Sequence, residues 1–222
     1  GPLKVETEEG TAELTDDVDI ANELNVYFAS VFRAEGGDVP LPMVTPLGYT
    51  NPLISIEFTA EKVEKAINSF RVDTAPGPDG ISARTLKSLK HVISPAISTI
   101  LTKTMNGDKL PSAWRLSNVA GIFKKGKRSD KRNYRPASMG CLLCKAGEKI
   151  VKSELLQHLI DNDMISPTQH GFLPGKSTTT NLIEYLDAIT SEVDQGNTVC
   201  SVYTDYSKCF DRIPHRLLLH KL

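Results

Sequence analysis

The sequence predicts an α+β fold that is mainly helical, with a few short antiparallel strands. Three observations lead to this fold class. Apolar residues recur at three- and four-residue intervals through most of the chain, as they do in amphipathic helices. Loops rich in proline and glycine separate these periodic segments. Only residues 117–123 and 198–204 have the composition and length typical of strands.

The first half of the chain predicts four helices. Asp16 or Asp17 can cap the first, which runs to about residue 32. Thr59 can cap the second, and Ser82 a third that ends near residue 91. Ser94-Pro95 is expected to open a separate fourth helix that ends before Gly107, because proline is tolerated only in a first turn. The loop at 74–80 is expected to be rigid and irregular.

The second half predicts two strands and two further helices. Strand 117–123 leads into the basic stretch 124–135, which we expect to be a strand–loop–strand hairpin. Helices are expected over about 141–161 and from Ser177 to about residue 195. The run 198–204 is expected to be a buried strand that ends at Asp205.

The net charge of −1 hides two opposed halves. Residues 1–60 contain two cations and eleven carboxylates, a charge of −9, which leaves +8 for residues 61–222. We expect an acidic helix and a Pro/Gly-rich linker (36–52) over residues 1–56, and a second unit over residues 57–222. The chain has no signal peptide and no apolar run of bilayer length, so no membrane partner is expected.

Several kinds of site are excluded or disfavoured by spacing. Residues 171–177 resemble a phosphate-binding loop, but three residues separate Gly171 from Gly175 where four are required. No Ser/His/Asp or HExxH arrangement supports a hydrolase. Cys141 and Cys144 form only half of a zinc pattern, and we interpret them as buried thiols of an amphipathic helix.

Two features favour a phosphate-handling site. Residues 124–135 carry seven cations and one anion, and such side chains can close over phosphates. A carboxylate at a strand end, as expected for Asp205, can hold Mg²⁺, which takes one or two protein carboxylates. The alternatives are that the basic stretch is an ordinary solvated loop and that Asp205 only ends a strand or caps a turn.

The ordered motifs resemble the reverse transcriptases of non-LTR retrotransposons, most closely the jockey and chicken-repeat type. The matching motifs are APGPDG (75–80), IFKKG (122–126), NYRP (133–136), QHGF with GKST (169–172 and 175–178), YTDYSKCFD (203–211) and IPH (213–215). The resemblance covers about residues 57–222. It implies a right-hand polymerase fold, of which this chain would be the fingers and the first part of the palm.

The resemblance also implies the site. It implies an RNA-directed DNA polymerase in which two Mg²⁺ ions extend a DNA primer on an RNA template from deoxynucleoside triphosphates. Asp205 matches the first catalytic, metal-binding aspartate, and the backbone carbonyl of Tyr206 would face the second metal. Lys124 and Arg135 match cations that grip the triphosphate, and Phe210 matches the aromatic residue under the sugar. Residues matching template-binding positions are Pro78, Asp79, Gly80, Gln169, Gly171, Phe172 and Lys176.

One departure from the family concerns the carboxylates. The family places two further carboxylates in a hydrophobic-x-Asp-Asp motif after the first, and none follows Asp205 here. We therefore expect a chain truncated after the first palm block and inactive by itself as a polymerase. A non-catalytic RNA- or DNA-binding remnant of a transposable element is the alternative. The resemblance implies an intracellular, nuclear protein; the sequence makes no prediction about its oligomeric state.

Overall fold

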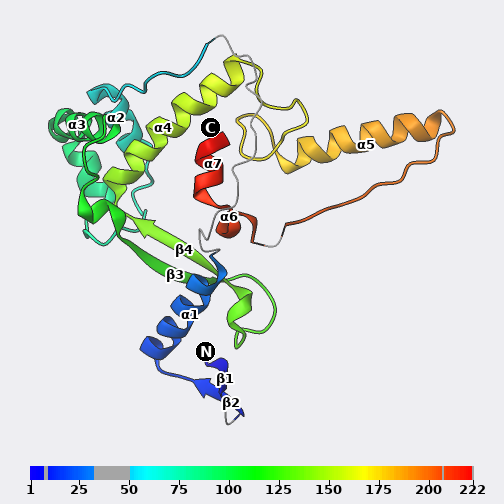
Figure 1. Cartoon of the computed structure of the whole chain (residues 1–222), viewed down its shortest axis with the longest axis horizontal. Coiled ribbons are helices and arrows are strands. Elements are labelled where there is room, and N and C mark those ends of the chain that lie inside the picture. The colour runs from blue at the N-terminus through cyan, green and yellow to red at the C-terminus, as the bar shows by residue number, and fades with distance from the viewer. Residues whose placement is uncertain (8–9, 33–50, 207, 222) are drawn as a thin grey trace.

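The main hydrophobic core lies where α2 (Ala60–Asn68), α3 (Ala83–Met105) and α4 (Leu142–Asp161) pack together (Figure 1). The structure is a computed structural model, and it describes residues 1–7, 10–32, 51–206 and 208–221. The core is formed by Phe58, Val63, Ala66, Ile67, Phe70, Ala83, Leu86, Ile97, Leu101, Leu142, Ala146 and Ile150. Within each of these helices the apolar residues recur at three- and four-residue intervals, as the sequence predicts. Each helix therefore turns one apolar face towards the core.

The predicted helix after Thr59 is confirmed as α2. The Thr59 hydroxyl accepts a hydrogen bond from the Lys62 amide at 3.2 Å, which satisfies one of the free amides of the first turn. Val63 and Ile67, one turn apart, are fully buried. The predicted hydrophobic side of this helix is thus its core side.

The predicted break near residues 91–94 is wrong, because α3 runs without interruption through Pro95. Proline has no amide to donate to the carbonyl four residues earlier, which weakens the helix at that turn. Buried residues on both sides of Pro95, including Leu86 and Ile97, face the same core and keep the two halves in line. The predicted start holds, because Ser82 caps the helix through the Thr85 amide at 3.1 Å.

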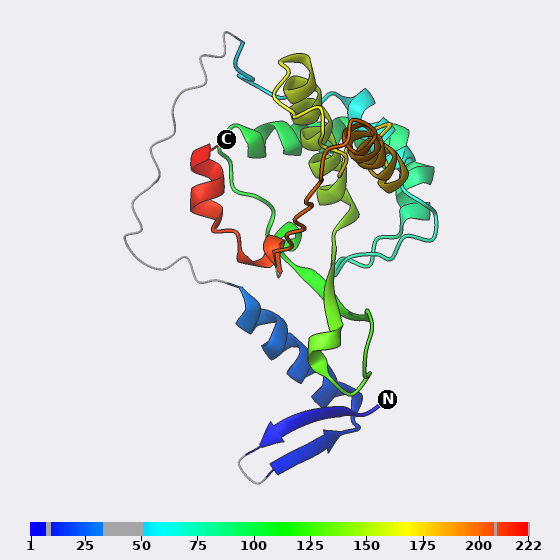
Figure 2. The ribbon, with the colours of Figure 1, turned by 90° about the vertical axis from the view of Figure 1, so that its right-hand side faces the viewer.

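The predicted basic hairpin is confirmed as β3 (Ser117–Phe123) and β4 (Tyr134–Gly140), which pair antiparallel. Phe123 lies opposite Tyr134, and the short 3₁₀ helix η2 (Lys131–Asn133) is part of the connecting loop. A second 3₁₀ helix, η1 (Ser112–Arg115), precedes β3. The hairpin carries the cations of residues 124–135 away from the helical core towards α1 (Figures 1 and 2).

The N-terminal segment forms a second, smaller cluster against this hairpin. Its helix is α1 (Asp17–Val31), capped by Asp16, as predicted. A hairpin of β1 (Leu3–Thr7) and β2 (Gly10–Leu14) precedes it and was not predicted. Leu3, Leu24 and Phe28 are the buried residues of this cluster. Of the predicted linker 36–52, residues 36–50 lie outside the described part of the chain.

The later helices are α5 (Thr178–Asp194), α6 (Cys209–Arg212) and α7 (His215–Lys221). The helices predicted over 141–161 and 177–195 are confirmed as α4 and α5. Figure 1 shows α5 projecting from the rest of the molecule, and none of its residues is buried. Within the described residues, no helix combines the length and apolarity that crossing a membrane requires.

The strand predicted over residues 198–204 is wrong. The segment is extended but pairs with no strand in the described part of the chain, and Val202 is 83% exposed. A β-branched, aromatic run favours a strand only where a neighbouring strand satisfies its backbone amides and carbonyls. Asp205 therefore follows an exposed extended segment and not a buried strand.

Candidate functional site

One pocket of about 670 Å³ lies between α1, the β3–β4 hairpin and residues 205–211. All the residues predicted to bind nucleotide or to act in catalysis line this pocket: Lys124, Arg135, Asp205, Tyr206 and Phe210. They are separated by up to 86 positions in the sequence, and the fold brings them to one cavity. Their proposed roles stay predictions, but the structure places them together.

The hairpin positions the two predicted phosphate-binding cations. Lys124 follows the last residue of β3, and Arg135 lies near the start of β4 opposite Ile122. A hydrogen bond of 2.8 Å from the Lys124 amide to the Asn133 carbonyl extends the ladder past Phe123. Among the described residues, neither Lys124 nor Arg135 has a carboxylate within 4 Å, so both charges are available to an anion.

A third cation of the pocket, Arg132, is already paired. Its guanidinium donates to both carboxylate oxygens of Asp130, with one contact of 2.9 Å. This bidentate hydrogen bonding lowers the pKa of Asp130 and raises the pKa of Arg132. Asp130 also caps η2, so the ion pair stabilises this turn. Because the charge of Arg132 is neutralised by Asp130, Arg132 offers less net charge to an anionic ligand than Lys124 or Arg135.

Asp205 supplies an exposed carboxylate to the same pocket, and Asp211 lines it as well. Mg²⁺ needs only one or two protein carboxylates when water and substrate phosphates complete its octahedral shell. An aspartate that shares a pocket with cations predicted to bind phosphate therefore fits such an ion. Among the described residues there is no group of three or more His, Cys, Asp or Glu side chains placed so that it could hold a metal ion. Ser207 of the motif lies outside them.

Phe210 joins this pocket to the predicted template block. Its ring meets Phe172 edge to face, with 6.0 Å between ring centroids and 83° between planes. Phe172 has a positive φ of 64°, an unfavourable conformation for a bulky residue. The fold thus places one predicted template residue against one predicted nucleotide residue.

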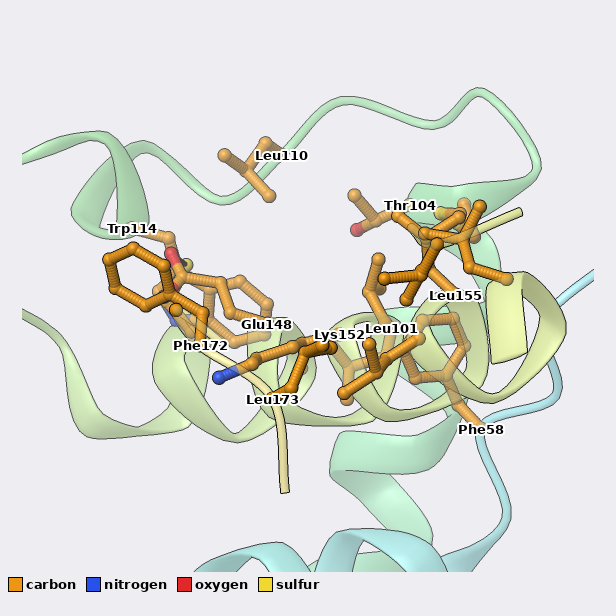
Figure 3. Close-up of a pocket in the computed structure, with 18 of the residues that line it drawn as sticks. Phe58, Leu101, Thr104, Leu110, Trp114, Glu148, Lys152, Leu155, Phe172 and Leu173 are labelled. Atoms are coloured by element: carbon orange, nitrogen blue, oxygen red, sulfur yellow. Dashed lines mark hydrogen bonds between the residues drawn. The ribbon is translucent and has the colours of Figure 1, made fainter. Parts of the chain in front are cut away.

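Three template candidates, Gln169, Gly171 and Phe172, line a second cavity of about 680 Å³ beside α4 (Figure 3). Its walls are mainly apolar, and Leu101, Trp114 and Leu155 are among the residues labelled there. Lys176 lies apart from this cavity. Its ammonium group donates to the Pro167 carbonyl at 3.3 Å and lies 4.0 Å from a Glu184 oxygen.

The other template candidates, Pro78, Asp79 and Gly80, are exposed at the far end of the hairpin. Their loop is anchored by Gly77, where an added Cβ would lie 2.6 Å from the Cys141 amide nitrogen. Gly77 therefore has to be glycine for this loop to reach the end of β4. The structure does not bring residues 78–80 to the pocket of Asp205.

Sequence reasoning missed two contributions to the pocket. Tyr27, Phe28 and Val31 of α1 line it, although the sequence indicated only that they share an apolar face. Lys208 also lines it, and its position inside the motif at 203–211 was the available signal. Nothing in the sequence of α1 indicated that this helix would close a cavity formed by residues more than 90 positions later.

Comparisons with known proteins find the same likeness for the family model and for the relatives. Residues 122–222 match the family described as reverse transcriptase (RNA-dependent DNA polymerase). The chain is 26% identical over 179 residues to a probable RNA-directed DNA polymerase from transposon BS of Drosophila melanogaster, which covers 80% of this chain and 20% of the relative. It is 26% identical over 178 residues to the RNA-directed DNA polymerase from the jockey mobile element of the same species (80% and 19%).

A third relative comes from another insect. The retrovirus-related Pol polyprotein from the type-1 retrotransposable element R1 of Bradysia coprophila is 28% identical over 158 residues, 70% of this chain and 15% of the relative. The chain thus spans about a fifth or less of the length of these relatives.

Proposed function

We propose that this chain, which is similar to the RNA-directed DNA polymerases of non-LTR retrotransposons, forms the fingers and first palm segment of such a polymerase. The observation that carries the proposal is the single pocket lined by Lys124, Arg135, Asp205, Tyr206 and Phe210. Cations for a triphosphate, a carboxylate for a metal and an aromatic ring for a sugar meet there. An ordinary solvated basic loop would have no reason to share a cavity with Asp205.

The proposed roles follow from the chemistry of each side chain. Lys124 and Arg135 bind the triphosphate oxygens, Arg135 through its planar fork of donors. Asp205, with the Tyr206 carbonyl, would hold Mg²⁺. When bound, such ions activate the primer 3′-hydroxyl and neutralise the charge of the leaving pyrophosphate. Phe210 packs against the sugar and is itself supported by Phe172.

The RNA template would contact two separate groups of residues. We propose that Gln169, Gly171, Phe172 and Lys176 guide the RNA template near the incoming nucleotide, and that residues 78–80 contact it farther away. The DNA primer would end at Asp205. The division at residue 56 and action in the nucleus are further parts of the proposal.

The test is RNA-templated primer extension by a polymerase that carries this chain. Asp205→Ala should reduce extension in Mg²⁺ about a hundredfold to a thousandfold, because electrostatic stabilisation of the transferring phosphoryl group is lost. Asp187→Ala, an exposed aspartate on α5 outside the pocket, is the matched control and should retain activity. Extension that survives Asp205→Ala would refute the site assignment.

A non-catalytic nucleic-acid-binding chain is the second candidate, and the observation that favours it is the exposed basic hairpin. The two candidates differ in their dependence on Asp205. Binding of RNA by the hairpin alone should be unchanged by Asp205→Ala, whereas Mg²⁺-dependent binding of a deoxynucleoside triphosphate should be lost. Binding of both ligands that is insensitive to Asp205 would favour the non-catalytic chain.

A further inference from the structure

The helix α1 is fixed against the hairpin that carries the phosphate-binding cations. Glu23 forms an ion pair with Lys131 of η2. Leu24 is buried, and an added Cβ at Gly121 of β3 would lie only 2.9 Å from its side chain. The Lys4 amide also donates to the Ser129 carbonyl at 2.8 Å, which ties the β1–β2 hairpin to the same loop. These contacts hold the next turn of α1 at the edge of the pocket.

Tyr27 lies on that next turn and faces Lys208. The Lys208 ammonium donates to the Tyr27 hydroxyl at 2.6 Å and lies 4.4 Å from the centre of its ring. The hydroxyl and the ring thus hold the same cation, by a hydrogen bond and a cation–π contact. The two residues are 181 positions apart in the sequence, and both are partly buried.

The turn at Lys208 is a fixed element as well. Lys208 has φ 53° and ψ 44°, the left-handed conformation that non-glycine residues rarely adopt, and it caps α6. Three residues earlier stands Asp205, and three residues later Asp211. Both carboxylates line the pocket, and Lys208 makes an ion pair with neither within the described part of the chain.

We propose that Tyr27 is a positioning residue of the nucleotide pocket: it holds Lys208 so that the ammonium group binds the polyphosphate and does not pair with Asp205. An ammonium group has three donors, and the Tyr27 hydroxyl takes one, which leaves two for phosphate oxygens. The lysine lines the same pocket as Lys124 and Arg135. This inference rests on the proposed function, because it requires a triphosphate in this pocket.

The experiment is calorimetric titration of the 222-residue chain with a deoxynucleoside triphosphate and Mg²⁺. Tyr27→Phe removes the hydroxyl and keeps the ring. It should weaken triphosphate binding about threefold to tenfold, the range expected for one hydrogen bond. Lys208→Ala should weaken binding at least as much. Tyr27→Phe should then have no further effect in the Lys208→Ala background, because Tyr27 acts through Lys208.

Two controls separate positioning from a general structural role. Tyr185→Phe removes a tyrosine hydroxyl outside the pocket, one that bonds to Ser201 at 2.7 Å, and should leave binding unchanged. The corresponding monophosphate should lose much less affinity than the triphosphate on Tyr27→Phe, since only the longer phosphate chain reaches Lys208. Equal losses for both ligands would indicate a structural role and overturn the inference.

The remaining outcomes distinguish this inference from the proposed function. Lys124→Ala and Arg135→Ala report on the function itself. If they weaken triphosphate binding while Tyr27→Phe does not, the inference fails and the function stands. Additive losses of Tyr27→Phe and Lys208→Ala would also overturn the inference. If the wild-type chain shows no saturable binding, or if Lys124→Ala and Arg135→Ala have no effect, both fail.

Discussion

Two cysteines near the start of α4 show how local surroundings set the chemistry of a residue. Cys141 is fully buried as the cap of α4, and its thiol donates to the Ala113 carbonyl at 3.2 Å. Burial, and then the nearby Asp79, raise the pKa of Cys141. Cys144, one turn later, has its pKa raised to about 11 by burial and by the Glu148 carboxylate. Both are free thiols; the sequence interpretation of buried thiols is confirmed for Cys141, whereas Cys144 is only partly buried.

The raised pKa of Cys144 predicts its reactivity. At neutral pH the thiol is protonated, so its alkylation by iodoacetamide should rise about tenfold per pH unit from pH 7 and level off only near 11. Glu148→Gln removes a charge that disfavours the thiolate. It should therefore lower the pKa and speed alkylation at pH 9. Mass spectrometry of the modified peptide measures the rate, and Glu154→Gln is the control. A plateau already at pH 9 would contradict the assignment.

At the scale of elements, α5 differs from the other long helices because packing contributes little to it. It buries no residue, although Leu182, Ile183 and Leu186 lie on it and are exposed. Its start is defined by a capping box in which Ser177 and Thr180 exchange hydrogen bonds, the Thr180 amide donating to Ser177 at 3.1 Å. A helix without tertiary support depends on such a cap more than a core helix does.

We therefore expect Ser177→Ala to act on α5 alone. Loss of the cap should cost about 1 kcal/mol of local helix stability. Amide hydrogen exchange over residues 178–194 should become several times faster, while the unfolding midpoint of the core of α2, α3 and α4 stays unchanged. Thr59→Ala, the equivalent change at the cap of α2, should instead lower that midpoint, because α2 packs in the core. A global loss of stability from Ser177→Ala would contradict this view.

At the scale of the whole molecule, the two opposed charge halves are in contact. The acidic N-terminal segment docks on the basic hairpin through Glu23 and Lys131 and through the backbone of Lys4 and Ser129. It does not cover the tip, where Lys125, Lys127 and Arg128 remain exposed. Although the net charge of the chain is only −1, the tip of the hairpin is therefore a locally cationic surface. Phosphate binding requires such a surface.

The cationic tip of the hairpin predicts that RNA binding weakens as the salt concentration rises. If Lys125 and Lys127 each neutralise one phosphate of single-stranded RNA, replacing both by alanine should reduce the slope of log K against log salt by about 1.4. Fluorescence anisotropy of a labelled oligonucleotide at several salt concentrations measures the slope. Lys103→Ala with Lys109→Ala removes the same charge at two exposed lysines outside the basic stretch 124–135 and should leave the slope unchanged. Equal effects of the two pairs would exclude the hairpin as the binding surface.

The sequence by itself determined the helix caps and most of the local elements, and it pointed to the family that the chain resembles. Asp16, Thr59, Ser82 and Ser177 each cap a helix where their side chains predict one, because a cap depends only on the next three residues. The ordered motifs likewise led to a resemblance that the comparisons confirm. Local signals of this kind need no knowledge of distant neighbours.

Only the tertiary structure decided what depends on distant contacts. It made α3 continuous through Pro95, since buried residues on both sides share one core. It left residues 198–204 unpaired, because strands need partners, and it made Tyr27 a wall of the pocket. A contact such as that between Tyr27 and Lys208 spans 181 positions, and no pattern along the chain encodes it. The sequence could name the chemical groups, whereas packing decided which of them meet.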